Sequence, residues 1–349
     1  MQPLIFPIFL DYLCNYECGH CSVGSSPRTK FPIDDDLVIS YIDQIAELPT
    51  AAGVVFTGGE PTLRKDLLLR AIASANERDL MTRVVTNAWW ARSEAKAERF
   101  VDDLKRAGLQ ELNTSWDGFH AEFGSLDNVA NAIATGLNAG MRVSVGVVEV
   151  EEGGSHKEAL VGAVGDRLGK TKEELRLLPL YVLVDFPAQV GTAESLDLSG
   201  VRAGERIYTG CTEVGTTLSL HPDGTVRGCC GHAVFYTPDL VLGDLRSTPL
   251  KDIVERAQGN IVYWWLRSQG PAGILRTLGV DVGDATHICQ ACSTLFSEHR
   301  QELVDYARAN KEAILADSVM SGHMVTGPVR VALTRKEKLM STATDLTET

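Results

Sequence analysis

The sequence predicts an α/β fold in which a partial (β/α)6 TIM barrel precedes a small C-terminal domain of a β-hairpin and helices. Up to about residue 205, short β-rich runs alternate with helical segments, and this alternation is typical of parallel strands joined by right-handed crossovers. Beyond that point the alternation ends and a cysteine-containing hairpin follows. Six strand–helix units rather than eight indicate an open barrel, whose active site belongs at the C-terminal ends of the strands.

The elements of the barrel follow in a regular order. The first predicted helix, 34–48, carries Leu37, Tyr41 and Ile45 on one stripe and Asp residues in its first turn. In the second half, the turn Asp223-Gly224 joins two short alternating runs, as in a β-hairpin. Strands are expected at 4–10, 53–57, 82–86, 111–115, 142–150 and 175–184, and further helices at 63–76, 91–107, 126–138 and 156–168.

Composition limits the classes of function. The 349 residues, 44% of them hydrophobic, are enough for a barrel at 1–205, a cluster-binding domain at 206–318 and a tail at 319–349. The net charge is −13 (33 basic and 46 acidic residues) and no Lys/Arg cluster stands out, so neither nucleic acid nor an acidic membrane surface is an expected partner. The sequence contains no run of 18 apolar residues, so it predicts no membrane-spanning helix. Eight cysteines in tight groups favour metal clusters in a reducing cytoplasm over disulfides.

Three cysteines lie in a loop directly after the first strand. Cys14, Cys18 and Cys21 follow the spacing C-x3-C-x2-C. Three thiolates can surround one soft metal centre and leave one coordination position without a protein ligand. A zinc site with His20 as the fourth ligand, or a redox thiol pair, is the alternative.

The loop resembles the signature of the radical S-adenosylmethionine (radical SAM) enzymes, C-x3-C-x-φ-C, with His20 at the aromatic position. The resemblance implies that Cys14, Cys18 and Cys21 hold a [4Fe–4S] cluster whose open iron binds S-adenosylmethionine. One electron, supplied by a flavodoxin- or ferredoxin-type reductant, then releases a 5′-deoxyadenosyl radical that abstracts hydrogen from C–H bonds. The protein provides placement and exclusion of water.

Strand ends extend the resemblance. Gly58, Gly59 and Glu60, after the second strand, match the GGEP segment that grips the methionine amino group in this family. Asn87 and Ser115 end the third and fourth strands, at positions similar to those that bind the ribose and carboxylate of the cofactor. A cap or turn role is the alternative for each polar strand end.

Candidates on the substrate side follow the fourth strand. His120 is a candidate general base or substrate ligand, with Asp117 beside it. The alternative is a structural pair at a helix start. Trp89 and Trp90, after the third strand, are either stacking platforms or packing residues.

The second half resembles the SPASM/twitch extension of the family, in its shorter form with one auxiliary [4Fe–4S] cluster. Full ligation by protein implies an electron relay, and tetrahedral zinc is the alternative. The expected ligands are Cys211, Cys229, Cys289 and Cys292.

Cys230 is the remaining cysteine and adjoins an expected ligand, so it could exchange roles with Cys229. Radical SAM epimerases use a spare cysteine to donate hydrogen to the face opposite abstraction, and Cys230 is a candidate for that role. An inert, partly buried cysteine is the alternative.

These features favour epimerisation or dehydrogenation of a sugar or aminocyclitol in natural-product biosynthesis. The alternative is a ribosomal peptide that is epimerised, cross-linked or oxidised. The lack of an extension before the first strand, where a leader-binding domain could lie, favours the small molecule. A non-catalytic iron–sulfur carrier or zinc module would leave Glu60 and the polar strand ends without a role.

Overall fold

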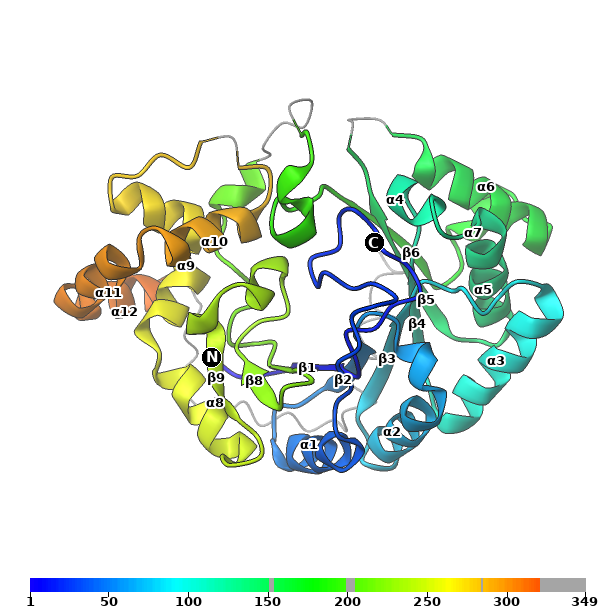
Figure 1. The fold of residues 1–349 in the computed structure, drawn as a ribbon, viewed down its shortest axis with the longest axis horizontal. Helices are drawn as coiled ribbons and strands as arrows, with labels where there is room; N and C mark the ends of the chain where they lie inside the picture. Colours follow the sequence, from blue (N-terminus) through cyan, green and yellow to red (C-terminus); the bar gives the residue numbers. More distant parts are fainter. Residues whose placement is uncertain (151–153, 199–204, 284, 321–349) are drawn as a thin grey trace.

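The computed structural model describes residues 1–150, 154–198, 205–283 and 285–320. Within these residues one nine-stranded sheet has the order β6-β5-β4-β3-β2-β1-β7-β8-β9 (Figure 1). Neighbours among the first six strands are parallel, which confirms the predicted open barrel. These strands are β1 (Ile5–Phe9), β2 (Gly53–Thr57), β3 (Met81–Thr86), β4 (Glu111–Ser115), β5 (Arg142–Val148) and β6 (Leu180–Asp185).

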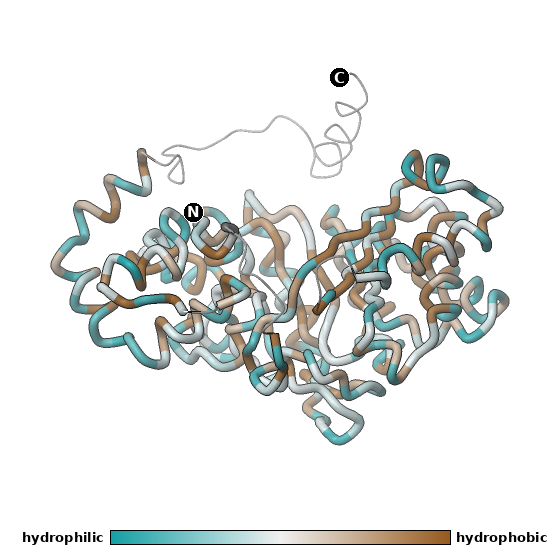
Figure 2. Tube along the Cα trace, turned by 90° about the horizontal axis from the view of Figure 1, so that it is seen from above, coloured by the Kyte–Doolittle hydropathy of each residue, from teal (hydrophilic) through white to brown (hydrophobic). Residues whose placement is uncertain are grey.

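Helices cover the outer face of this sheet (Figure 1). Strand side chains such as Ile8, Phe56 and Leu112 are fully buried against them. Figure 2 shows the same division, with hydrophobic residues along the strands through the middle of the molecule. The covering helices are α1 (Asp35–Glu47), α2 (Lys65–Glu77), α3 (Glu94–Ala107), α5 (Leu126–Asn138) and α6 (His156–Leu168).

The sixth strand begins later than predicted. Thr171 and Glu174 form a capping box that starts a short helix, α7 (Lys172–Leu175), so the chain enters β6 only at Leu180. Two other short helical segments also lie beside barrel strands, η1 (Pro61–Arg64) after β2 and α4 (Gly118–Ala121) after β4.

The predicted hairpin forms, and it extends the barrel sheet. Strands β7 (Ser219–Leu220) and β8 (Thr225–Arg227) are antiparallel, and β9 (Val241–Asp244) pairs with β8. Ile8 of β1 pairs in parallel with Leu220 of β7. Since one hydrophobic core contains residues of both halves, the boundary at residue 205 stays a prediction.

Within the residues that the structure describes, five helices follow β9. They lie beyond β9, at the left of Figure 1. No helix in the described ranges is long and apolar enough to cross a membrane. Nearly all of the expected tail lies outside the described residues. The helices are α8 (Leu250–Gly259), α9 (Ile261–Thr277), α10 (Ile288–Ser297), α11 (Arg300–Ala309) and α12 (Lys311–Met320), and the connections include η2 (Gly191–Ser195), η3 (Glu205–Tyr208), η4 (His232–Phe235) and η5 (Pro238–Leu240).

Candidate active site

The cysteine loop lies at the C-terminal edge of the barrel strands. Cys14 and Cys18 are buried and Cys21 is half-buried, and all three border a cavity of about 280 Å³. The Tyr16 amide donates to Cys14 Sγ at 3.3 Å. Burial raises the pKa of the Cys14 thiol to about 12, so a metal centre would have to stabilise its thiolate.

Two glycines let the second strand end approach this loop. A Cβ on Gly58 would lie 2.4 Å from the Asp11 carbonyl oxygen, and one on Gly59 would lie 2.2 Å from the Leu13 carbonyl oxygen. The Gly59 amide donates to Asp11 at 2.9 Å. The glycines therefore serve contact with the chain's own cysteine loop, and Gly59 also borders the cavity.

Glu60 is almost fully buried, and its carboxylate is occupied by donors from the chain. Oε1 accepts from the amide and hydroxyl of Thr62 (3.1 and 2.5 Å) and from the Thr86 hydroxyl (2.8 Å). Oε2 accepts from the Asn87 amide at 2.8 Å. Burial raises the pKa of Glu60, whereas these hydrogen bonds lower it. The carboxylate thus joins the end of β2 to the end of β3.

Asn87 and Ser115 both border the cavity, at neighbouring strand ends. The Asn87 amide nitrogen Nδ2 lies 3.6 Å from Cys14 Sγ and donates to Asn15 Oδ1 at 3.0 Å. The structure therefore brings together the cysteine loop, Gly59, Asn87 and Ser115, as the sequence predicts.

Asp117 begins α4 and pairs with two histidines. Its Oδ1 accepts from the amides of Phe119 and His120 at 3.0 Å each, and His120 Nδ1 lies 2.9 Å from it. His20 Nε2 lies 3.5 Å from Asp117 Oδ2. Burial alone would raise the pKa of Asp117, but the hydrogen bonds from His120 lower it below its usual value. The helix-start pair that the sequence offers as an alternative is therefore present.

His20 and His120 also border the cavity. His20 stacks on Phe119 with ring centroids 4.5 Å apart, and burial lowers its pKa to about 4. Its buried Nδ1 has no hydrogen-bond partner among the described residues. A neutral ring with a free polar atom and three nearby thiols fits an iron–sulfur cluster with an organic ligand beside it.

A second group of thiols lies between the hairpin and α10. Cys289 is in the first turn of α10, where its amide donates to His287 Nδ1 at 3.0 Å. A Cβ on Gly231 would lie 2.9 Å from Cys289 Sγ and 3.3 Å from Cys229 Sγ, so only glycine fits between these sulfurs. Burial raises the pKa values of Cys229 and Cys292, and the charges of Cys211 and Cys289 raise them further. Closely spaced thiols of this kind, one buried and three half-buried, suit a metal cluster.

Cys230 lies beside the second thiol group, where the charges of Cys211 and Cys289 act on it, and also beside the barrel strands. It borders a cavity of about 480 Å³ together with Val55, Thr57 and Val85, from the inner face of the barrel. Val85 also borders the cavity at the cysteine loop. Burial raises the pKa of the Cys230 thiol, so the thiol stays protonated at neutral pH. Its Sγ lies 3.7 Å from Glu213 Oε2, and Thr217 Oγ1 donates to that oxygen at 2.8 Å.

Several contacts around the two thiol groups were not predicted. The Thr192 hydroxyl donates to the Cys21 carbonyl at 2.5 Å, and Ser22 hydrogen-bonds to His232. Tyr12 Oη lies 2.7 Å from His221 Nδ1, between the loop and the hairpin. Each contact joins residues more than 170 positions apart, and no local sequence pattern indicates such pairs.

Comparison with known proteins identifies the class. A family model described as the radical SAM superfamily matches residues 12–147, and one described as an iron–sulfur cluster-binding domain (SPASM) matches residues 211–293. This chain belongs to the radical SAM superfamily and carries a C-terminal SPASM domain. It is a radical SAM enzyme, and its cofactors are a [4Fe–4S] cluster with S-adenosylmethionine and an auxiliary [4Fe–4S] cluster. The zinc alternatives have no support from these matches.

The individual relatives share little sequence identity with this chain. The Bacillus subtilis (strain 168) protein named "Putative peptide biosynthesis protein YydG" is 21% identical over 299 residues, which are 83% of this chain and 91% of the relative. The GTP 3′,8-cyclase of Campylobacter curvus is 28% identical over 160 residues, and this match covers 41% of this chain and only 48% of the cyclase.

Solved structures are less similar still. A structure of native anSMEcpe with bound AdoMet and Kp18Cys peptide is 15% identical, with a TM-score of 0.49 over 88% of this chain and all of that chain. BtrN in complex with AdoMet and 2-DOIA is 17% identical, with a TM-score of 0.44 over 74% of this chain and 86% of that chain.

Proposed function

We propose that this protein is a radical SAM epimerase that inverts a carbon centre in a peptide, with Cys230 as the hydrogen-atom donor. Cys14, Cys18 and Cys21 would hold the radical SAM cluster. Cys211, Cys229, Cys289 and Cys292 would hold the auxiliary cluster, which we assign to electron relay. Gly59, Asn87, Ser115 and His20 would contact S-adenosylmethionine. When bound, the cluster and S-adenosylmethionine supply a 5′-deoxyadenosyl radical that removes a hydrogen atom from a C–H bond.

The observation that carries the proposal is the position of the Cys230 thiol, which borders a cavity together with residues of the barrel strands. Its S–H bond can give a hydrogen atom to a carbon radical from the face opposite abstraction, which breaks S–H and forms C–H with inversion. The sulfur radical that remains regains its hydrogen from one proton and one electron. Glu213, held by Thr217 beside the sulfur, is placed to return the proton. A flavodoxin- or ferredoxin-type reductant would supply the electron.

Two features support a peptide over the sugar or aminocyclitol that the sequence favours. One is the match across most of both chains to a relative named for peptide biosynthesis. The other is the edge of the barrel. Among the described residues β6 pairs only with β5, and its Tyr181, Leu183 and Val184 side chains are exposed. An exposed apolar edge strand can add a peptide as a further strand.

Dehydrogenation, oxidation and cross-linking are the reactions that this proposal rejects. In each of them the substrate radical loses a further electron instead of gaining a hydrogen atom, so Cys230 would have no role as a donor. The eight cysteines without a disulfide in the described chain agree with the expected cytoplasmic location, which we include in the proposal.

The test uses reconstituted enzyme, dithionite, S-adenosylmethionine and a candidate peptide encoded beside its gene, in D₂O. The expected product has the mass of an epimer with one solvent deuterium at the inverted carbon, because the Cys230 S–H exchanges with solvent. Cys230→Ala should still form 5′-deoxyadenosine but no epimer. An oxidised product, or normal epimer formation by Cys230→Ala, would contradict the proposal.

A further inference from the structure

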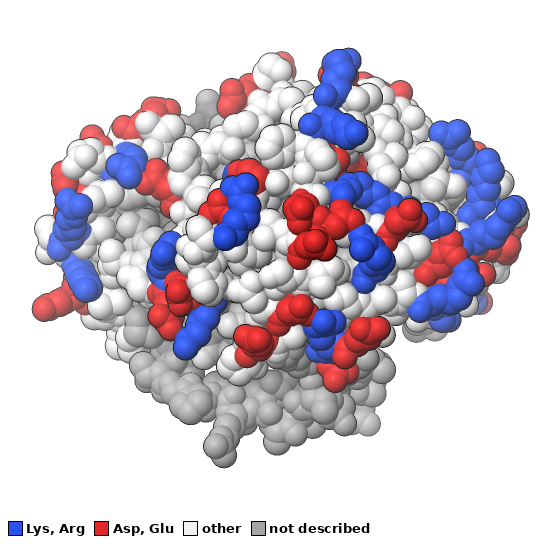
Figure 3. All heavy atoms as spheres, turned by 60° about the horizontal axis from the view of Figure 1, so that its bottom comes forward, with Lys and Arg blue, Asp and Glu red and all other residues white. Residues whose placement is uncertain are grey.

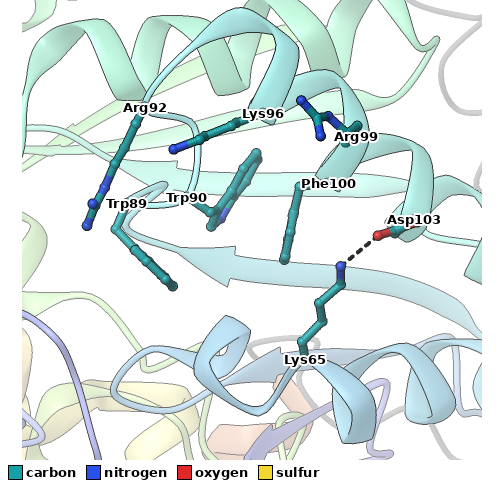
Figure 4. Close-up of a pocket in the computed structure, with 8 residues that line it drawn as sticks. All are labelled: Lys65, Trp89, Trp90, Arg92, Lys96, Arg99, Phe100 and Asp103. Atoms are coloured by element: carbon teal, nitrogen blue, oxygen red, sulfur yellow. Dashed lines mark hydrogen bonds and ion pairs between the residues drawn. The ribbon is translucent and has the colours of Figure 1, made fainter.

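A pocket of about 320 Å³ lies outside the barrel, between the start of α2 and one face of α3 (Figure 4). We call it the basic pocket. Three rings line its centre, with Trp90 and Phe100 stacked at 4.5 Å between centroids. Figure 4 shows cationic side chains around these rings. The cations are Lys65, Arg92, Lys96 and Arg99, and one carboxylate, Asp103, completes the lining.

The charge of this pocket is opposite to that of the whole chain, which carries −13. Asp103 pairs with Lys65 at 2.6 Å. Within the described part of the chain, no carboxylate lies within ion-pair distance of Arg92, Lys96 or Arg99, all of which are exposed. Figure 3 shows basic side chains, with acidic ones among them, at the right-hand end of the molecule, where Figure 1 places α3, α5 and α6.

Helix α3 sorts its charges onto separate faces. Lys96 and Arg99 line the basic pocket. Glu94, Glu98 and Asp102 line a different cavity, on the side of α5. Because the spacing of three and four residues places each set on its own face of the helix, Lys96 and Arg99 lie apart from these three carboxylates. The one carboxylate on the pocket side, Asp103, pairs with Lys65.

The basic pocket is connected to the radical SAM cysteines through Trp89. The Trp89 amide donates to Asn87 Oδ1 at 3.1 Å, and Asn87 Nδ2 lies 3.6 Å from Cys14 Sγ. The Trp89 ring packs against the group formed by Cys14, Tyr16 and Cys18. The Arg92 guanidinium lies 5.4 Å from the centroid of the Trp89 ring.

Backbone conformation places these two side chains. Ala88, fully buried between Asn87 and Trp89, has a φ of +58°, which is unusual for a residue with a side chain. This turn lets Asn87 contact the cysteine loop while Trp89 borders the outer pocket. A strained residue at this position indicates that the surroundings hold the turn in place.

We propose that the basic pocket is the docking surface for an acidic one-electron carrier protein of the flavodoxin class, which reduces the radical SAM cluster. The proposal rests on the proposed function only in assigning Cys14, Cys18 and Cys21 to that cluster. The reduced flavin of the carrier would donate one electron to the cluster that Cys14, Cys18 and Cys21 would hold, and no bond would be made or broken. Charge complementarity would steer the carrier to this face, where Trp89 borders the basic pocket and also packs against the group formed by Cys14, Tyr16 and Cys18.

The test compares two double variants with the same change in charge. Lys96→Glu/Arg99→Glu reverses the basic pocket, whereas Arg308→Glu/Lys311→Glu reverses two exposed residues on α11 and α12, at the opposite end of the molecule. The probe is a recombinant bacterial flavodoxin. Its dissociation constant with the holoenzyme is measured anaerobically at low and high salt, and cluster reduction is followed by loss of visible absorbance.

Lys96→Glu/Arg99→Glu should raise the dissociation constant at low salt by about tenfold and slow reduction by flavodoxin similarly. Reduction by dithionite should not change, and the α11/α12 variant should behave like the parent. The proposal is overturned if the parent does not bind flavodoxin, if both variants weaken binding equally, or if the basic-pocket variant loses dithionite reduction or peptide binding instead. None of the flavodoxin measurements requires epimerisation, so either proposal can fail while the other stands.

Discussion

Single glycines set the position of the cysteine loop. Gly58 and Gly59 are predictable from the motif, and the structure adds a reason for them that the motif does not give. They face the backbone of Asp11 and Leu13, and this contact holds the loop that carries the three cysteines. Close approach of two backbones leaves no room for even a methyl group.

Gly59→Ala should therefore displace the loop. A Cβ 2.2 Å from a carbonyl oxygen forces backbone movement, and the radical SAM cluster should be lost while the auxiliary cluster remains. Iron per chain should fall by about half after reconstitution, because each [4Fe–4S] cluster holds the same number of irons. Gly162→Ala, in α6 with open space around it, is the matched control and should keep the full iron content. Equal iron content in both variants would show that the contact is not needed.

Glu60 shows what a motif does not reveal. The sequence places it at the edge where the cofactor binds, yet its carboxylate accepts four hydrogen bonds from Thr62, Thr86 and Asn87. Only the fold brings Thr86 and Asn87 to it, from the next strand. Direct contact of this carboxylate with S-adenosylmethionine stays a prediction.

At the scale of elements, the hairpin is joined to the cysteine loop through one histidine. His221 is fully buried, stacks on Phe9 at 4.6 Å between centroids, and contacts Tyr12 and Ser219 through its two ring nitrogens. The sequence predicts the hairpin from its turn and alternation. It does not predict that β7 pairs with β1, because that pairing joins residues more than 200 positions apart.

His221 should make folding sensitive to acid. Burial lowers its pKa to about 3, below the value near 6.5 of the unfolded chain. Between these values the unfolded chain binds more protons, so His221 contributes a loss of stability as pH falls below 6.5 and none above it. Between the two pKa values, the contribution of His221 to the free energy of unfolding should fall by about 1.4 kcal/mol for each pH unit of acidification. Anaerobic urea unfolding at pH 4.5 to 8 should show a shallower slope for His221→Gln below pH 6.5. Parallel curves for the two proteins would contradict this prediction.

The exposed edge of β6 gives a second prediction at this scale. If a peptide adds to this edge, it would cover the charged side chain introduced by Leu183→Lys and remove it from water. This substitution should therefore weaken peptide binding and raise KM by about tenfold or more. Cleavage of S-adenosylmethionine without peptide should not change. Leu177→Lys, equally apolar and even more exposed but outside the strand, is the control. An equal effect of both substitutions would argue against strand addition.

Across the whole molecule, local patterns predict most strands and helices, because hydrophobic periodicity and helix caps depend only on residues that are close together in the sequence. Motif spacing likewise predicts which cysteines gather. Features assembled from distant segments are not predictable in this way. The cations of the basic pocket come from α2, α3 and the turn between β3 and α3, so no continuous run of Lys and Arg in the sequence indicates the pocket. Glu213 approaches Cys230 only because the hairpin folds back toward β1.

The central claim is that Cys14, Cys18 and Cys21 hold a [4Fe–4S] cluster with one iron open to S-adenosylmethionine. Electron paramagnetic resonance of dithionite-reduced protein, recorded with and without S-adenosylmethionine, tests it most directly. In the parent, the cofactor should change the signal and 5′-deoxyadenosine should form. Cys14→Ala/Cys18→Ala/Cys21→Ala should keep only an auxiliary-cluster signal that the cofactor does not alter. Zinc in the parent, or a cofactor-dependent signal that survives in the triple variant, would contradict the account.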